Sequence, residues 1–139
     1  TTLFRSAAEW EHACRAGMGT RFCYGDDPKR LGDYAWFAGE RNVNDEPSPV
    51  GGKKPNACGL YDMHGNVWEW CQYSPMGKGP IGGVDERPLR GGCWQDDADF
   101  CTAAALATIS RTDTSAALGF RVVRTAAVDN SQRRGTGTE

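Results

Sequence analysis

The chain has 139 residues, which is enough for one domain with a single hydrophobic core. Its formal charge of −2 provides no basic face for nucleic acid, and no segment has the apolar length needed to cross a bilayer. We therefore expect neither nucleic-acid binding nor membrane insertion. Eighteen glycines and seven prolines predict a loop-rich fold built from short elements.

The six cysteines leave the redox compartment open. In an oxidising compartment they would permit many different sets of disulfide pairs. None of them forms a CxxC pair, which excludes a zinc ribbon and a thioredoxin-like motif. We favour the alternative of buried free thiols in a cytoplasmic protein. Free cysteine packs as a small hydrophobe, and no export signal is visible at the N-terminus.

The first predicted element is a helix that begins after Ser6. Ser6 followed by Glu9 is typical of a capping box, in which each residue satisfies a main-chain N–H of the other. Trp10 and Cys14 are four residues apart and so share one helix face. Gly17 stands where a left-handed residue ends a helix.

Short strands and loops are expected along the rest of the chain. The alternation of Trp68, Glu69 and Trp70 predicts a strand, since side chains alternate between the faces of a sheet. Before it we expect a short strand over 21–24, turns over 25–33, a buried aromatic cluster over 34–37 and a loop over 38–57. After it we expect a loop over 72–88, a strand with a glycine bend over 89–94, a mostly irregular stretch over 95–117 with a short strand near 102–105, a closing strand over 118–124 and a disordered tail over 126–139.

Four blocks of sequence carry a family resemblance. They are EWEHACRAG at 9–17, the run from Pro55 through GLYDMHGNVWEW at 59–70, LRGGCW at 89–94 and LGFRVV at 118–123. In order and spacing they resemble formylglycine-generating-enzyme (sulfatase-modifying factor) domains over nearly the whole chain. The resemblance implies an α+β fold of the C-type-lectin type, with short twisted strands, one or two helices and much ordered loop, over residues 1–125.

The blocks also identify candidate core residues. We predict that Trp68, Trp70, Phe120 and Val122 are buried together, because the blocks that contain them correspond to core strands in such domains. The two tryptophans are expected to be scaffold rather than a binding site. Other expected scaffold residues are Trp94, Cys101 and Ala104.

Calcium is a cofactor that the resemblance implies for some members. Matched residue by residue, its ligands would be the carboxylates of Asp62 and Glu69 and the carbonyls of Gly65 and Val67. Such hard oxygen ligands suit Ca²⁺, with waters completing the shell. The alternative is that Asp62 and Glu69 bond to nearby main-chain N–H groups. A second calcium site of larger members is expected to be absent, because its loop is shortened here around 38–50.

The residues at the family's two copper-binding positions do not form a pair of cysteines in this chain. The aerobic enzymes of this family oxidise a substrate cysteine with two Cu(I)-binding cysteines five residues apart. The second of these matches Cys101, but the first matches Asp96, which is no ligand for Cu(I). Cys93 stands where the family has serine, so we do not accept it as a replacement. The only histidines, His12 and His64, cannot supply the metal triad of the related iron-dependent branch, so copper and catalysis are both disfavoured.

Residues 93–118 depart from the family pattern in a particular way. Relatives are rich in Asn and Arg here, whereas this stretch contains no Asn. Asp, Ala, Thr, Ser, Phe and Leu stand at many of those positions. This resembles the variable proteins of diversity-generating retroelements, in which mutagenesis rewrites Asn codons on one exposed face of a fixed lectin-fold scaffold. Ordinary drift is the alternative explanation.

The resemblance therefore favours a ligand-binding module whose partner is a protein or another macromolecule. Its variable face would be carried by residues 93–118, because loops on a rigid frame can vary without unfolding it. The candidate binding residues are Trp94, Gln95, Asp96, Asp97, Asp99, Phe100, Ala105, Leu106, Thr108, Ser110, Arg111, Thr112, Thr114 and Ser115. Phe100 and Trp94 are the expected aromatic anchors, unless Trp94 lies in the core. The alternatives are a formylglycine-generating oxidase and a non-catalytic accessory domain.

Overall fold

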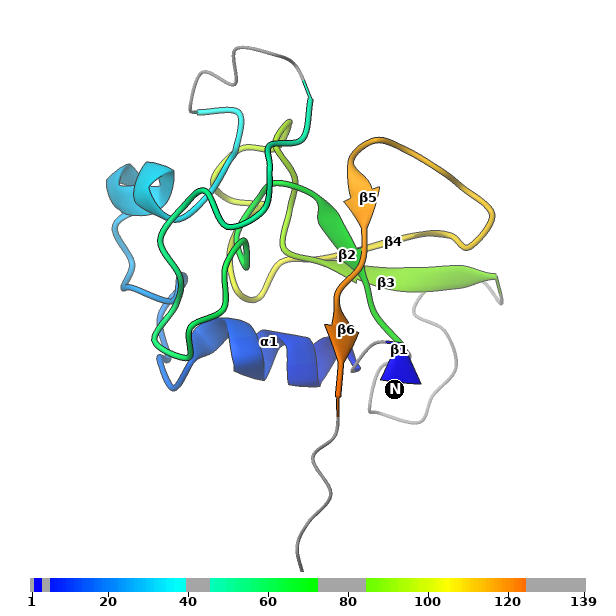
Figure 1. Ribbon diagram of the computed structural model, residues 1–139, viewed down its shortest axis with the longest axis horizontal. Coiled ribbons are helices and arrows are strands. Elements are labelled where there is room, and N and C mark those ends of the chain that lie inside the picture. Colours follow the sequence, from blue (N-terminus) through cyan, green and yellow to red (C-terminus); the bar gives the residue numbers. More distant parts are fainter. Residues whose placement is uncertain (1, 4–5, 40–45, 73–84, 125–139) are drawn as a thin grey trace, which may run out of the picture.

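The computed structural model describes residues 2–3, 6–39, 46–72 and 85–124, which form the α+β fold that the sequence predicts (Figure 1). In chain order its elements are β1 (Thr2–Leu3), α1 (Ala7–Arg15), the 3₁₀ helix η1 (Pro28–Asp33), β2 (Trp68–Trp70), β3 (Glu86–Arg90), β4 (Leu106–Ser110), β5 (Leu118–Gly119) and β6 (Val122–Val123). The tail 126–139, predicted to be disordered, lies outside the described residues. Among the described residues, no helix is long and apolar enough to span a membrane.

Helix α1 begins as the capping box predicts. The Ser6 hydroxyl accepts a hydrogen bond from the Glu9 N–H at 3.3 Å, and the Glu9 carboxylate accepts one from the Ser6 N–H at 3.0 Å. The helix ends one residue earlier than expected, because Ala16 is left-handed at φ 49° as well as Gly17 at φ 89°. Trp10 and Cys14 lie on its buried face as predicted.

Four strands form the main sheet, in the order β4-β3-β2-β5. Strand β3 is antiparallel to both of its neighbours, β2 and β4, whereas β5 joins the other side of β2 in parallel. Helix α1 lies along one side of this sheet, and β6 and β1 form a separate two-stranded pair beside the helix (Figure 1). Before β2, the chain around Asn56 passes the C-terminal end of α1, where the Asn56 side chain donates to the Ala13 and Cys14 carbonyls.

Several predicted strands are shifted or missing. Residues 21–24 contribute only a bridge between Phe22 and Gly25, and the strand predicted over 89–94 is β3, which ends at Arg90. The strand expected near 102–105 begins at Leu106. The closing segment 118–124 is two strands rather than one, and it is interrupted where the Arg121 side chain reaches back to Glu69.

The prediction that four hydrophobic residues are buried together is wrong. Phe120 is 65 % exposed and Val122 is 58 % exposed, while Trp68 and Trp70 are half-buried. The reason is the orientation of β2, whose inward-facing residue is Glu69 (6 % exposed), so that both tryptophans lie on the opposite face.

Two clusters form the core instead. One joins α1 to the central block through Ala7, Trp10, Cys14, Met63, Cys71 and Ala103. The other consists of Phe22, Leu31, Ala35 and Cys101. Cys101 is scaffold as predicted, but Ala104 is exposed and its neighbour Ala103 is the buried alanine.

The Gly65–Asn66 pair connects these parts. Both residues are left-handed, at φ 75° and φ 66°. The Gly65 N–H donates to the Gly91 carbonyl at 2.7 Å, and the Asn66 N–H donates to the Trp36 carbonyl at 2.8 Å. The Asn66 carbonyl in turn accepts from the Trp94 N–H at 2.9 Å. This junction places the loop after β3 next to the start of β2.

Candidate functional site

The loop that follows β3 carries the first group of candidate binding residues. Gln95, Asp97, Asp99 and Phe100 are exposed, Phe100 by 56 %. Trp94, by contrast, is buried, so it belongs to the core, the alternative that the sequence left open. The loop thus presents one exposed aromatic ring among acidic and polar side chains.

This loop is held at three points. The Asp96 carboxylate accepts from the Cys93 N–H at 2.8 Å, and the Asp96 carbonyl accepts from the Ala38 N–H at 2.9 Å. Asp99 forms an ion pair with Arg21 at 2.5 Å. Half-buried Asp96 is therefore a positioning residue within the loop rather than a free contact group.

Strand β4 and the turn after it carry the second group. By register Leu106 lies opposite Arg90, so the side chains of Leu106, Thr108 and Ser110 lie on the sheet face that carries Arg90. Leu106 is 43 % exposed, and Ala105, Thr108 and Ser110 are half-buried. In the following turn, Arg111, Thr112, Thr114 and Ser115 are exposed.

The loop 95–100 and the turn 111–115 lie at opposite ends of β3, and β4 runs alongside β3 between them. The loop 95–100 follows the last residue of β3, whereas the turn begins where the Arg111 N–H donates to the Asp85 carbonyl at 3.0 Å. A five-residue strand spans about 17 Å, so a contact surface that includes both groups must extend along the sheet. Such a span fits a macromolecule better than a small ligand.

The proposed calcium ligand Glu69 already binds a cation. Arg121 donates to both of its carboxylate oxygens, at 2.7 Å from Nη2 to Oε1 and 3.0 Å from Nε to Oε2. The indole N–H of Trp10 also donates to Oε2 at 2.7 Å. Although burial lowers the pKa of Arg121, its bonds with Glu69 raise that pKa above its usual value. Glu69 thus joins β2 to the segment between β5 and β6 through the ion pair with Arg121. It also joins β2 to α1 through the hydrogen bond from Trp10.

Asp62 has a different partner. Its Oδ2 accepts from the Gly51 N–H at 2.7 Å, while its Oδ1 is buried without a hydrogen-bond partner among the described residues. Within the described part of the chain, no group of three or more His, Cys, Asp or Glu side chains could hold a metal ion. Of the two predicted carboxylate ligands, Glu69 is thus already neutralised by Arg121, whereas Asp62 keeps one buried oxygen without a partner among the described residues.

The residues at the copper positions also fail to provide two thiolates. Cys101 is completely buried, with its Sγ 4.0 Å from the Cys93 carbonyl oxygen. Burial raises the pKa of Cys101 well above its usual value and the pKa of Cys93 to about 11. Asp96 stands at the position that matches the first copper-binding cysteine, and a carboxylate is a poor ligand for Cu(I).

His64 is a buried residue whose role sequence reasoning did not identify. Its Nε2 accepts from the Cys23 N–H at 3.1 Å, so its Nδ1 carries the proton and donates to the Cys101 carbonyl at 2.7 Å. Burial lowers the pKa of His64 to about 4. The neutral ring therefore connects the segment after α1, the central block and the loop that carries Cys101. No local pattern signals these partners, which are 41 and 37 residues away.

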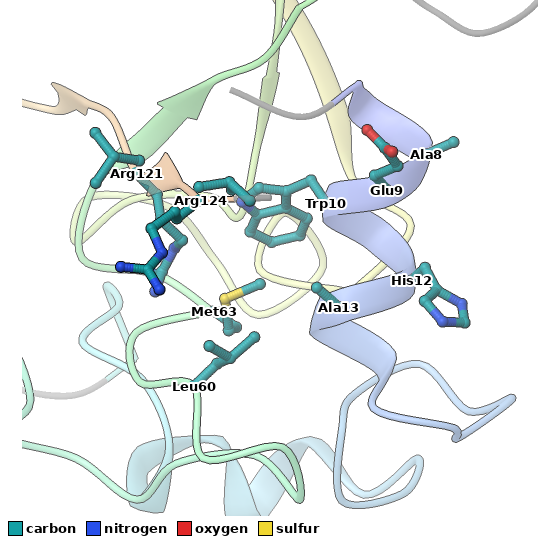
Figure 2. Close-up of a pocket in the computed structure, with 11 residues that line it drawn as sticks. Ala8, Glu9, Trp10, His12, Ala13, Leu60, Met63, Arg121 and Arg124 are labelled. Carbon is teal, nitrogen blue, oxygen red and sulfur yellow. The ribbon is translucent and has the colours of Figure 1, made fainter. Parts of the chain in front are cut away.

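A groove between α1 and β6 was also missed. It has a volume of about 550 Å³ and contains none of the fourteen candidate binding residues. Figure 2 shows Trp10, Met63 and Leu60 across its floor, with Ala13 and His12 on the helix side and Arg121 and Arg124 opposite. The exposed Val122 lines the groove as well. Because Val122 was expected from the sequence to be buried, this groove could not be predicted.

Comparison with known proteins places the chain in a family. A family model described as "Sulfatase-modifying factor enzyme 1-like domain" matches residues 4–126. The formylglycine-generating enzyme of Streptomyces coelicolor is 33 % identical, with 82 % of this chain and 44 % of that protein covered. The mouse protein "Inactive C-alpha-formylglycine-generating enzyme 2" is 37 % identical, with 85 % and 41 % covered.

A solved structure is similar as well. Treponema denticola variable protein 1 is 35 % identical, with a TM-score of 0.72 over 86 % of this chain and 45 % of that one. The chain spans less than half the length of each of these three proteins. The matched blocks, the C-type-lectin-like α+β fold and these similarities together show that the chain belongs to the sulfatase-modifying factor enzyme 1-like domain family.

Proposed function

We propose that this chain is a ligand-binding module of the variable-protein kind. Its contact surface comprises the loop 95–100, exposed Leu106 with half-buried Thr108 and Ser110 of β4, and the turn 111–115. The observation that carries the proposal is the contrast between these exposed or half-buried positions and the buried framework beneath them, which includes Trp94, Cys101 and Ala103. Exposed positions accept many residue types, whereas buried positions do not.

The likeness to Treponema denticola variable protein 1 supports the same proposal. The contact surface has the composition of a recognition site, with Phe100 and Leu106 exposed among acidic and hydroxyl side chains. Phe100 is the natural anchor, because a large exposed ring on an anchored loop buries much apolar area at little entropic cost.

Two experiments test this proposal. The gene neighbourhood should contain a near-identical template repeat of the coding region for 93–118 and a reverse transcriptase gene. In a binding selection against folded target proteins, Phe100→Ala should reduce the affinity of selected targets at least about tenfold. The matched control is Val50→Ala, an exposed apolar residue outside the surface, which should leave affinity unchanged. Equal effects of the two substitutions would contradict the assigned surface.

The rival function is oxidation of a cysteine in a protein substrate, as the formylglycine-generating relatives suggest. A copper-loaded sample is offered a cysteine peptide, and the aldehyde product is measured by mass. We expect no product above the level of a Cys101→Ser control, because Cys101 is buried and Asp96 replaces the other copper ligand. Product that depends on Cys101 would favour the oxidase.

A further inference from the structure

Strand β4 is the edge of the main sheet. The strand order β4-β3-β2-β5 leaves one side of Leu106–Ser110 without a neighbouring strand in the described part of the chain. Its sequence, Leu-Ala-Thr-Ile-Ser, has no charge and no proline. Edge strands usually carry charged residues or proline, which prevent pairing with another chain. This edge lacks that protection.

The register determines which main-chain groups point outward. The Pro88 carbonyl accepts from the Cys71 N–H at 2.9 Å, so the main-chain groups of Pro88 face β2. Main-chain groups alternate along a strand, so the polar groups of Arg87 and Leu89 face β4 and pair with Ile109 and Ala107. The N–H and C=O groups of the alternate residue Thr108 therefore point away from the sheet.

The neighbouring positions point the same way. Leu106 and Ser110 are each two residues from Thr108, so their main-chain N–H and C=O groups also point away from the sheet. The Ser110 carbonyl already accepts from the Asp113 N–H at 3.0 Å. The Arg111 N–H donates to the Asp85 carbonyl, which is consistent with odd-numbered residues of both strands facing each other. Three consecutive outward positions thus form a short ladder with no partner strand.

We propose that this edge pairs with β4 of a second copy of the chain. The two strands would run antiparallel, with Thr108 of one copy opposite Thr108 of the other. This register pairs all five residues of each strand, with Leu106 opposite Ser110 of the second copy. A shift in register would leave strand residues unpaired, so the twofold arrangement centred on Thr108 makes the most hydrogen bonds.

The side chains fit this register. The small Ala107 lies opposite the larger Ile109 of the second copy, and both are half-buried in the single chain. Threonine opposite threonine is a favourable cross-strand pair. The first charged residue after the strand is Arg111, which is paired with Asp85 at 3.3 Å and would face Ala105 rather than another charge. This complementarity of the strand with itself favours a second copy over an unrelated peptide.

Pairing through the main chain leaves the side-chain faces available. Leu106, Thr108 and Ser110 project from the sheet face, not from its edge. A pair of copies would form one continuous sheet that presents two contact surfaces side by side. This consequence rests on the proposed function, because a macromolecular target with repeated sites would then be bound with avidity.

The test is the mass in solution as a function of concentration. The wild-type chain should sediment at 15.1 kDa when dilute and approach twice that mass at high concentration. Because one strand pair is smaller than a standard interface, the dissociation constant should be on the order of 100 µM. Thr108→Lys puts two like charges opposite each other and should weaken association at least about tenfold.

A matched control keeps this test specific. Thr114→Lys adds the same charge at an exposed residue off the strand and should associate like the wild type. If Thr108→Lys fails to fold, amide exchange of the wild type replaces it. The Thr108 amide should then exchange more slowly at high concentration, while the Thr114 amide does not change.

A wild-type chain that stays at 15.1 kDa at millimolar concentration would overturn the inference, as would equal weakening by both lysine variants. Neither result would affect the proposed ligand binding, which is measured separately through Phe100.

Discussion

His64 holds three segments of the chain together only while its ring is neutral. Protonation would place a second N–H at Nε2, directly against the Cys23 N–H that now donates to it. Burial accounts for the low pKa of about 4, and the bond to the Cys101 carbonyl only partly offsets it. The native state thus binds this proton less readily than the unfolded chain does.

Acid should therefore destabilise the protein through His64. The pKa of His64 is 6.5 in the unfolded chain and about 4 in the folded protein. The contribution of this residue to the free energy of unfolding is therefore fully present above pH 6.5 and is lost as the pH falls towards 4. Between pH 7 and pH 5 the free energy of unfolding should decrease by about 2 kcal/mol from this residue. Urea unfolding at both pH values measures it.

His64→Gln is the control for this prediction. Glutamine has no titratable ring, so the variant should lose stability at pH 7 but show a pH dependence smaller by about 2 kcal/mol. An unchanged pH dependence would mean that other groups, such as carboxylates, account for the acid sensitivity.

The ion pair of Glu69 with Arg121 competes with calcium binding at the same carboxylate. We expect 5 mM CaCl₂ and EDTA to leave the Tm unchanged, because Arg121 and Trp10 already satisfy the carboxylate. Glu69→Gln should destabilise the chain by about 3 kcal/mol, since it leaves a partly buried guanidinium without its counter-ion. A calcium-induced rise in Tm that disappears in Glu69→Gln would instead restore the calcium site.

At the scale of elements, Gly65 determines how closely β2 approaches the loop before it. A Cβ at this position would lie 2.2 Å from the Trp36 carbonyl oxygen. That carbonyl accepts from the Asn66 N–H, so neither group can move without breaking the junction. The close approach is why glycine is required here, in addition to its positive φ of 75°.

Gly59 provides a matched comparison. Its φ of 76° equals that of Gly65 within a degree, but a Cβ there would have no atom within 4 Å. Gly59→Ala should therefore cost only the backbone strain of about 1–2 kcal/mol. Gly65→Ala should cost about 2–3 kcal/mol more, because it adds overpacking. Thermal unfolding of both variants measures the difference, and equal losses would contradict the contact with Trp36.

At the scale of the whole molecule, the contact surface and the core should differ in their tolerance of substitution. Simultaneous replacement of Gln95, Asp97, Phe100 and Thr114 by alanine should change the free energy of unfolding by no more than about 2 kcal/mol. Ala103→Leu alone should cost about 1–3 kcal/mol, because this residue is completely buried.

Denaturant unfolding of the two variants tests whether the fourfold set lies in the contact surface and Ala103 in the core. A collapse of the fourfold variant would mean that these residues are structural, and the proposed variable surface would lose its physical basis.

The sequence by itself determined the family, the α+β class, the capped helix and the strand at Trp68–Trp70. These features depend on local patterns, such as the Ser6–Glu9 spacing and period-two alternation, which need no knowledge of distant residues. Cys101 was expected to lie in the scaffold beneath the variable face, and it is completely buried. In the structure, the candidate contact residues of the loop 95–100 and the turn 111–115 are exposed, apart from half-buried Asp96.

Only the tertiary structure decided which face of β2 is inside. Alternation alone cannot distinguish buried tryptophans from a buried Glu69, because the choice depends on Arg121, which is 52 residues away. The same ion pair draws Arg121 inward, so the closing strand is interrupted and Phe120 is exposed. The partners of His64 and the unpaired edge of β4 likewise arise from contacts between distant segments, which no local pattern of this sequence encodes.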